Sequence, residues 1–187
     1  MKITILTGAG ISAESGIRTF REGLWEGKTI SEVSSNDSDP KLVSAFYNDL
    51  EQQIIRAKPN AAHFAITKLT KHHQVTLITQ NVDDLHEKAG SQPLHLHGEI
   101  GSVVLYGDEP KHLSHIYNVL PQSELFLSIG TSNNTYPAAS FVSFAKNAKR
   151  IEFNTNKTEL SHKFDLHING PASVTVPEWT MNFLRGK

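Results

Sequence analysis

Two short segments of the sequence carry side chains suited to proton transfer and to amide recognition. His97 lies directly before Gly98 and follows an expected strand. An imidazole with an ordinary pKa of about 6.5 can accept a proton at neutral pH. Asn81 and Asp83 follow another expected strand and offer an amide and a carboxylate. If both strands end at the same edge of one sheet, a base, an amide and a carboxylate can face one ligand.

A metal site is one alternative for these histidines. His95 lies two residues before His97, so we expect both on the same face of the strand. Such a pair can form half of a metal site, whereas an isolated histidine is more commonly structural or solvated. The nearest further ligands are Asp83 and His86, which we assign to an amide partner and to a helix surface. We therefore expect no bound metal.

A glycine-rich turn follows the first expected strand. Gly8-Ala9-Gly10-Ile11-Ser12-Ala13 has the G-x-G-x-x-A form of the dinucleotide fingerprint. Glycines there permit a tight turn and let the backbone approach a pyrophosphate, although a turn that merely needs glycine is the simpler alternative. A nicotinamide dehydrogenase would have a second strand ending in an acidic residue about 20 positions on, where this chain has a polar loop. The turn therefore predicts nucleotide binding without ordinary nicotinamide redox chemistry.

The elements that must position these residues alternate along the chain. Short aliphatic and β-branched runs predict strands at 3–7, 75–79, 94–96, 125–129, 151–153 and 166–168. Apolar spacing of three and four residues, together with capping residues, predicts helices at 40–57, 60–69, 82–89, 113–120, 138–148 and 178–184. The alternation predicts a doubly wound α/β fold with a parallel sheet of about six strands. The polar segment 16–39 breaks it and is expected to be a mobile loop with a lid or binding role.

The composition excludes several classes of function. The 187 residues include no cysteine, which excludes a disulfide framework, a thiolate nucleophile and cysteine-bearing zinc sites. The net charge is -1, so no overall field attracts nucleic acid or an anionic membrane. No apolar stretch approaches the ~20 residues of a membrane-spanning helix, and the amino terminus is not typical of a signal peptide. We expect a cytoplasmic protein.

Five blocks resemble, in order, the signature blocks of the sirtuins, most closely the bacterial type: GAGISAESGIRTFRE, TQNVDDLH, HLHGE, GTSNNTYPAASF and GPAS. They extend over nearly the whole chain. The resemblance implies a Rossmann-like fold and an NAD-dependent protein lysine deacylase, which cleaves the nicotinamide bond of NAD and transfers the acyl group to ADP-ribose. It further implies a single catalytic domain, 1–187, with a cofactor-binding loop and small helical module inserted at 17–58.

The same resemblance implies roles for individual residues. The catalytic residues would be His97, as the general base, with Asn81 and Asp83 at the nicotinamide ribose and carboxamide. The cofactor NAD would be bound by Gly8, Ala9, Gly10, Ser12, Phe20, Arg21, Gln80, Asn81, Asp83, Gly130, Thr131, Ser132, Asn154 and Ala172. Because a weakly nucleophilic amide oxygen must attack the sugar, water has to be excluded. Phe20 in the closing loop could provide that shield, or could simply pack there.

The chain departs from the sirtuin pattern after its histidine. Sirtuins generally carry a four-cysteine zinc ribbon before a phenylalanine-glycine-glutamate loop, whereas here residues 98–105 lead directly to Tyr106-Gly107-Asp108-Glu109. In sirtuins this ribbon holds one side of the acyl-peptide cleft, so the resemblance implies a cleft without that side here. Val103 to Tyr106 could still offer an edge strand to an extended peptide, or be a simple sheet edge. We expect substrate contacts from Tyr47, Val103, Val104, Tyr106 and Gly107.

A second departure concerns the acyl group. Relatives that remove succinyl or malonyl groups carry a tyrosine followed three residues later by an arginine that pairs with the acyl carboxylate. Here Tyr47 is present, but Leu50 takes the place of the arginine. Arg56 could reach the acyl carboxylate only from about two helical turns away. The sequence therefore predicts poor desuccinylation.

Three functions are compatible with these residues. The leading one is a zinc-free NAD-dependent deacylase acting on an acylated lysine of a protein or peptide, with no nucleic-acid or membrane partner. The same cofactor cleavage with another acceptor gives an NAD glycohydrolase or an ADP-ribosyltransferase, which the missing ribbon favours. The third is a non-catalytic sensor of NAD or ADP-ribose. The presence of His97 beside Asn81 and Asp83 argues against a sensor, because binding alone needs no base.

Overall fold

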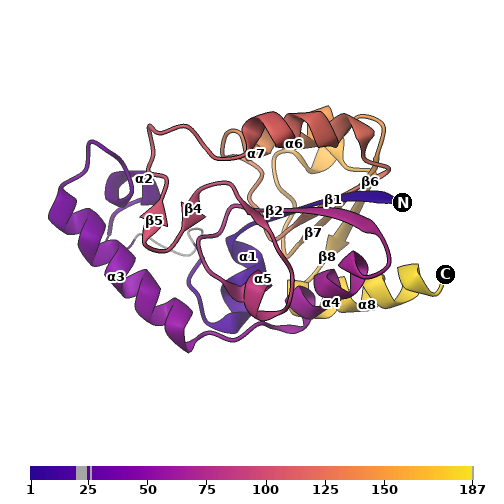
Figure 1. Ribbon diagram of the computed structural model, residues 1–187, viewed down its shortest axis with the longest axis horizontal. Coiled ribbons are helices and arrows are strands. Elements are labelled where there is room, and N and C mark those ends of the chain that lie inside the picture. The colour runs from indigo at the N-terminus through magenta and orange to yellow at the C-terminus, as the bar shows by residue number, and fades with distance from the viewer. Residues whose placement is uncertain (20–24, 26, 187) are drawn as a thin grey trace.

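The computed structural model describes residues 1–19, 25 and 27–186. Its centre is a six-stranded sheet in the order β3-β2-β1-β6-β7-β8, with every neighbouring pair parallel (Figure 1). The strands are β1 (Lys2–Thr7), β2 (Gln74–Thr79), β3 (Leu94–His95), β6 (Leu125–Ile129), β7 (Lys149–Asn154) and β8 (Leu166–Asn169). The predicted doubly wound α/β fold, with six parallel strands, is confirmed.

Helices cover both faces of the sheet (Figure 1). On one face α4 (Ala61–Thr70) and α8 (Ala172–Leu184) pack on inward-facing residues of β1, β6 and β7. On the other face α6 (Leu113–Val119) and α7 (Ala138–Phe144) enclose a second apolar cluster. Both faces are therefore buried, which explains why the strands are apolar at nearly every position.

A third apolar cluster lies beside the sheet. It joins α2 (Ile30–Val33) and α3 (Pro40–Arg56) to Ile17 and Leu85. The carboxylate of Asp39 accepts a hydrogen bond from the backbone N–H of Lys41 at 2.9 Å and so caps α3. That residues 17–58 act as one cofactor-binding module remains a prediction.

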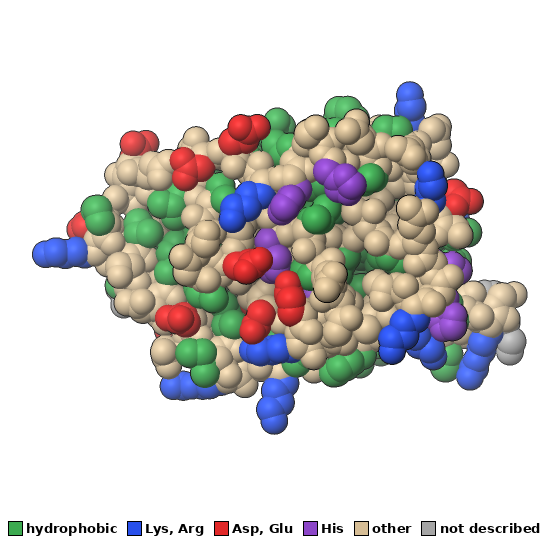
Figure 2. Space-filling model, in the orientation of Figure 1, with side chains coloured by type: hydrophobic (Ala, Val, Ile, Leu, Met, Phe, Trp, Pro, Cys, Tyr) green, Lys and Arg blue, Asp and Glu red, His purple; other side chains and the backbone are tan. Residues whose placement is uncertain are grey.

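The remaining elements are short. They are α1 (Ala9–Ser12), α5 (Leu85–Lys88), the antiparallel pair β4 (Gly98–Glu99) and β5 (Ser102–Val103), and the 3-10 turns η1 (Ala13–Ser15), η2 (Leu120–Gln122) and η3 (Ser161–Lys163). Among the described residues, no helix is both long and apolar enough to cross a membrane. Acidic and basic side chains are interspersed over the face shown in Figure 2, in keeping with the net charge of -1.

Several expected helix boundaries were wrong. The helix expected at 82–89 begins only at Leu85, because the carboxylate of Asp83 accepts the Leu85 N–H at 3.1 Å. The helix expected at 138–148 ends at Phe144. The last helix begins at Ala172, six residues before the expected start, with Pro177 inside it. Proline removes one main-chain hydrogen bond there, and the packing of the helix on the sheet offsets the loss.

The segment expected to be a mobile loop, 16–39, contains a helix. Its residues 30–33 form α2, which starts with a capping box between Thr29 and Glu32. The Thr29 N–H donates to the Glu32 carboxylate at 2.7 Å. Hydrogen bonding at the helix start thus stabilises an element too short to produce a recognisable apolar period.

Candidate functional site

The strand order reverses between β1 and β6, since β2 and β3 extend the sheet from one side and β7 and β8 from the other. Ligands bind open α/β sheets at such a switch point, beyond the carboxyl ends of the strands. A cavity of about 1130 Å³ opens there. Its lining includes Gly8, Ala9, Gly10, Ser12, Tyr47, Gln80, Asn81, Asp83, His97, Val103, Val104, Tyr106, Gly107, Gly130, Thr131, Ser132, Asn154 and Ala172. Of the residues expected at the site, only Phe20 and Arg21 lie outside the described part of the chain.

The floor of the cavity is formed by two glycine loops in contact. The Gly10 N–H donates to the Gly130 carbonyl at 2.7 Å. A Cβ atom on Gly10 would lie 2.7 Å from the Gly130 Cα, and one on Gly130 would lie 2.5 Å from the Ile11 nitrogen. Neither position can therefore hold a side chain. The glycines are required first of all for this close approach of the loops after β1 and β6, and the expected approach to a pyrophosphate remains a prediction.

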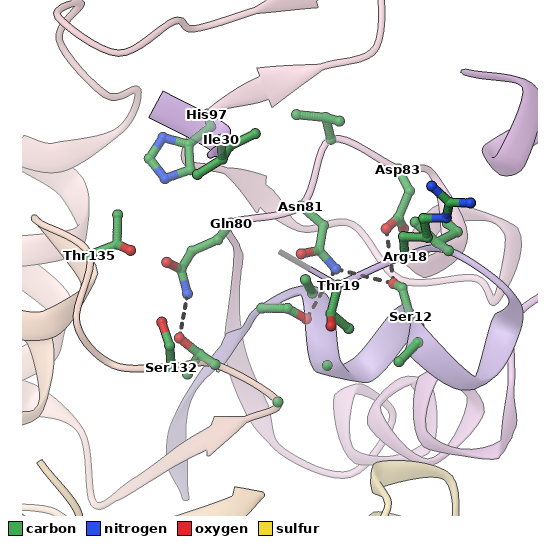
Figure 3. A pocket seen from close by; sticks show the side chains of 18 of the residues that line it. Ser12, Arg18, Thr19, Ile30, Gln80, Asn81, Asp83, His97, Ser132 and Thr135 are labelled. Carbon is green, nitrogen blue, oxygen red and sulfur yellow. Dashed lines mark hydrogen bonds between the residues drawn. The ribbon is translucent and has the colours of Figure 1, made fainter. Parts of the chain in front are cut away.

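Ser12 connects the two polar side chains that follow β2 (Figure 3). The Asn81 amide nitrogen donates to the Ser12 hydroxyl at 3.1 Å, and this hydroxyl donates to the Asp83 carboxylate at 2.9 Å. The Asn81 amide nitrogen also donates to the Gly8 carbonyl at 3.2 Å. The side chains of Asn81 and Asp83 are therefore held in fixed positions by the glycine turn.

These bonds determine which polar atoms remain for a ligand. The Asn81 amide nitrogen already donates to Gly8 and Ser12, so the side-chain carbonyl oxygen is the atom of Asn81 that can accept a hydrogen bond from a ligand. Each Asp83 oxygen already has one donor, from Ser12 or from Leu85, and a carboxylate can accept further hydrogen bonds. Burial raises the pKa of Asp83, although those two bonds act in the opposite direction. The pair thus presents mainly acceptors.

His97 faces the same cavity. In Figure 3 its imidazole lies near Gln80 and across from Thr135. Burial lowers the pKa of His97, so the ring is neutral at neutral pH. Its backbone carbonyl accepts the Val104 N–H at 2.8 Å, which fixes the main chain at this point. A neutral, positioned imidazole can accept a proton from a ligand.

Two other histidines lie elsewhere than expected. His95 does not line the cavity beside His97: its Nδ1 bonds to the main-chain carbonyl of Asn81 and its Nε2 to the Glu87 carboxylate, both at 2.8 Å. The strand ends at His95, so the alternation expected for a longer strand does not apply. His86 is not on a helix surface but 1% exposed. No group of three or more acidic or histidine side chains in the described part of the chain is arranged to hold a metal ion.

Thr131 connects two other residues that line the cavity, Gln80 and Asn154. Its hydroxyl accepts from the Gln80 side-chain amide at 2.9 Å, and its carbonyl accepts from the Asn154 amide at 2.7 Å. Glu14, which is not among the expected site residues, also lines the cavity. Its carboxylate accepts from the N–H and hydroxyl of Ser173 at 2.9 and 2.7 Å, connecting η1 to the start of α8. Its place directly after the glycine motif, inside the first of the five sirtuin-like blocks, was the one signal available.

The segment expected to bind an acyl peptide is already paired along one edge. The Tyr106 N–H donates to the Ser34 carbonyl at 2.7 Å, and the Tyr106 carbonyl accepts the Asn36 N–H at 3.2 Å. Val103 pairs with Gly98 in the β4–β5 hairpin. An extended peptide could therefore add only along the other edge of this segment.

An apolar recess adjoins this segment. Side chains of the third cluster line the cavity there, among them Ile17, Phe46, Leu50 and Ile54. The Tyr47 hydroxyl is hydrogen-bonded to the Ser34 hydroxyl at its edge. Burial raises the pKa of Tyr47, so the phenol stays protonated. The recess thus suits an uncharged group.

Comparison with known proteins gives the relationships of the chain. Residues 8–103 match the Sir2 family. The chain is 41% identical to a Bdellovibrio bacteriovorus protein named NAD-dependent protein deacylase, over 97% of this chain and 96% of the relative. It is 37% identical to an Escherichia coli protein of the same name, over 99% of this chain and 83% of the relative.

Solved structures of Sir2 homologues give the same relationship. A Sir2 homologue in complex with NAD superposes with a TM-score of 0.92 at 30% identity, covering 99% of this chain and 90% of that one. A mutant Sir2 homologue with ADP-ribose gives a TM-score of 0.93 at 29% identity, covering 99% and 92%. The alignment with the Bdellovibrio relative extends over 226 positions against the 187 residues of this chain, so at least 39 positions have no counterpart here. On these findings, the chain belongs to the Sir2 family.

Proposed function

We propose that this protein is an NAD-dependent protein lysine deacylase that transfers an acyl group from lysine to ADP-ribose. The observation that carries the proposal is that one cavity contains the paired glycine loops, the fixed side chains of Asn81 and Asp83, and the neutral imidazole of His97. The names of the curated relatives and the complexes of Sir2 homologues with NAD and ADP-ribose support it.

The residues of the cavity fit NAD. Its volume of about 1130 Å³ exceeds the ~300–1,000 Å³ usual for small-molecule sites, which leaves room for a dinucleotide. The floor at Gly10 and Gly130 is a cradle that a Cβ atom would fill. Gly8, Ala9, Thr131, Ser132, Asn154 and Ala172 would hold the ADP-ribose part, and Phe20 and Arg21 remain expected contacts.

NAD, when bound, supplies a ribose carbon that can accept the acyl oxygen once nicotinamide has left. The acceptor atoms of Asn81 and Asp83 would bind the carboxamide N–H groups and orient the nicotinamide ring, while Ser12 holds both side chains. His97 would take up a proton from a ribose hydroxyl at its unprotonated ring nitrogen. The apolar side chains of the recess would exclude water around the acyl group, which favours transfer over hydrolysis.

The first test is a product analysis with NAD and an acetylated lysine peptide. We expect nicotinamide and acetyl-ADP-ribose to appear together, and only when the peptide is present. Nicotinamide release without peptide would instead identify an NAD glycohydrolase, which the missing ribbon favours. Labelling of a protein would identify an ADP-ribosyltransferase. Tight NAD binding without any product would identify a sensor and contradict the proposal.

A second prediction concerns acyl choice. Leu50 is 6% exposed and lies in the apolar recess, where a succinyl carboxylate would be buried among apolar side chains. We expect acetyl peptides to be cleaved about tenfold or more faster than matched succinyl peptides, compared as kcat/KM. Arg56 is exposed on α3, but Arg18 lines the cavity. Faster cleavage of succinyl peptides would contradict the prediction, and Arg18→Gln would then show whether that guanidinium pairs with the carboxylate.

We also infer that the acyl peptide adds to Val103 to Tyr106 along the edge that faces away from residues 34–36, since the edge facing those residues is occupied. Tyr47, Val103, Val104, Tyr106 and Gly107 remain its expected contacts. The cytoplasmic location and the absence of nucleic-acid and membrane partners likewise remain predictions from the sequence.

A further inference from the structure

A carboxylate is buried in the sheet outside the cavity. Glu152 of β7 is 0% exposed, and its strand neighbours in register are Ser128 of β6 and His167 of β8. Residues paired in register present their side chains on the same face of a sheet. These three therefore form a polar row on the face that α6 and α7 otherwise cover with apolar side chains.

Four donors surround the Glu152 carboxylate. One oxygen accepts from the Asn133 amide and the Thr158 hydroxyl, each at 2.8 Å. The other accepts from the Ser161 hydroxyl and from His167 Nδ1, the latter at 2.8 Å. Glu152 thereby ties the loop after β6, the loop after β7 and strand β8 to one point.

Asn133 connects Glu152 to residues that line the cavity through a chain of hydrogen bonds. Asn133 has a left-handed backbone with φ of 56°, and its side-chain oxygen accepts from the Ser128 hydroxyl at 3.0 Å. Its backbone N–H donates to the Thr131 hydroxyl at 3.2 Å. That same hydroxyl accepts from the Gln80 amide, and both Thr131 and Gln80 line the cavity. Asn133 and Glu152 do not line it, so any effect they have on a ligand is indirect.

Packing alone does not account for this arrangement. A buried carboxylate loses its hydration, and an apolar network of similar volume is commonly as stable or more stable. What apolar side chains could not do is hold Asn133 in its left-handed conformation by directed hydrogen bonds. We propose that Glu152, acting through Asn133, is a positioning residue that fixes residues 130–134 for the ADP-ribose part of the cofactor. This inference rests on the proposed function.

The decisive variant is Asn133→Gly. Glycine adopts positive φ freely, so the change removes the side-chain bridge with little backbone strain. We expect ADP-ribose binding, measured by calorimetry, to weaken about tenfold, and the KM for NAD to rise by about the same factor with kcat within about twofold. Glu152→Gln should have a smaller effect, because the glutamine carbonyl can still accept from the Asn133 amide.

A matched control separates positioning from general loss of stability. Thr4→Val removes a buried hydroxyl bond to Ser123, at 2.6 Å and at the opposite end of the sheet. It should lower the Tm without changing ADP-ribose binding. Wild-type affinity in Asn133→Gly, or an equal loss in Thr4→Val, would overturn the inference. A wild-type protein that fails to bind ADP-ribose would instead contradict the proposed function.

Discussion

Replacing His97 with alanine should lower the rate of acyl transfer by about 10²–10⁴-fold, the range that a positioned general base contributes. The imidazole lines the cavity, and burial lowers its pKa so that it is unprotonated at neutral pH. Alanine cannot accept the ribose proton. Steady-state rates with NAD and an acetylated peptide measure the effect, and ADP-ribose affinity should stay within about twofold because the base acts after binding.

The pH dependence gives a second readout on the same residue. Because the pKa of His97 lies below its ordinary value, wild-type kcat should be level at neutral pH and fall on the acid side, below about 6.5. This acid limb should be absent from the residual activity of His97→Ala. An exposed histidine provides the control, since His115→Ala should leave both the rate and the profile unchanged. A large loss of ADP-ribose affinity in His97→Ala would contradict the role as base.

The second large effect is a loss of stability in mild acid. His63 and His86 are 0% and 1% exposed, and their rings meet edge to face with centroids 4.9 Å apart. His63 Nε2 and His86 Nδ1 are buried without a hydrogen-bond partner among the described residues. Burial lowers the pKa of His63 to about 4 and that of His86 to about 3. Both rings are therefore neutral in the folded protein at pH values at which the unfolded chain takes up protons.

The direction follows from proton uptake. Below the unfolded pKa of about 6.5 the unfolded state binds more protons, so stability falls as the pH falls, until the folded pKa values of about 4 and 3 are reached. Each histidine contributes up to about 1.4 kcal/mol per pH unit. Together they should lower the free energy of unfolding by about 4 kcal/mol between pH 7 and pH 5. His95 and Asp83 offset part of this loss of stability. Their pKa values are raised in the folded protein, so at these two groups the folded state takes up protons more readily than the unfolded state as the pH falls.

Urea unfolding at pH 7 and pH 5 measures this loss. In His86→Gln the difference between the two pH values should shrink by roughly half, since one of the two buried rings is gone. Glutamine can keep a hydrogen bond to the Thr7 hydroxyl, which His86 contacts at 3.0 Å. His115→Gln, at an exposed position, should leave the pH dependence as in the wild type. An unchanged pH dependence in His86→Gln would show that the acid sensitivity arises elsewhere.

The six strands could be predicted because parallel strands covered on both faces are apolar at almost every position. The site residues that follow strands could be predicted for a related reason, since the ends of β1, β2, β6 and β7 meet at one edge of the sheet. Their positions in the chain are then enough to bring Gly8, Asn81 and Thr131 to one cavity.

Side-chain networks could not be predicted in this way. Glu152 is a charged residue in a strand, which in a sequence resembles an exposed position, and its partners lie 6 to 19 residues away in other loops and strands. His86 belongs to a helix of only four residues, too short to show which face is buried. Pro177 resembles a helix start, although it lies inside α8. In each case tertiary packing determines whether the residue is buried or where the helix begins, and the local sequence pattern does not indicate it.

The contact between Gly10 and Gly130 bears on how the cavity could be redesigned. It is made by main-chain atoms alone, so it sets no demand on the identity of neighbouring side chains and only excludes any at these two positions. Libraries aimed at new acyl groups can therefore retain this pair and vary the apolar side chains of α3 that line the recess, within the limits that the packing of the third cluster sets. Diversity introduced at either glycine would yield mostly misassembled variants.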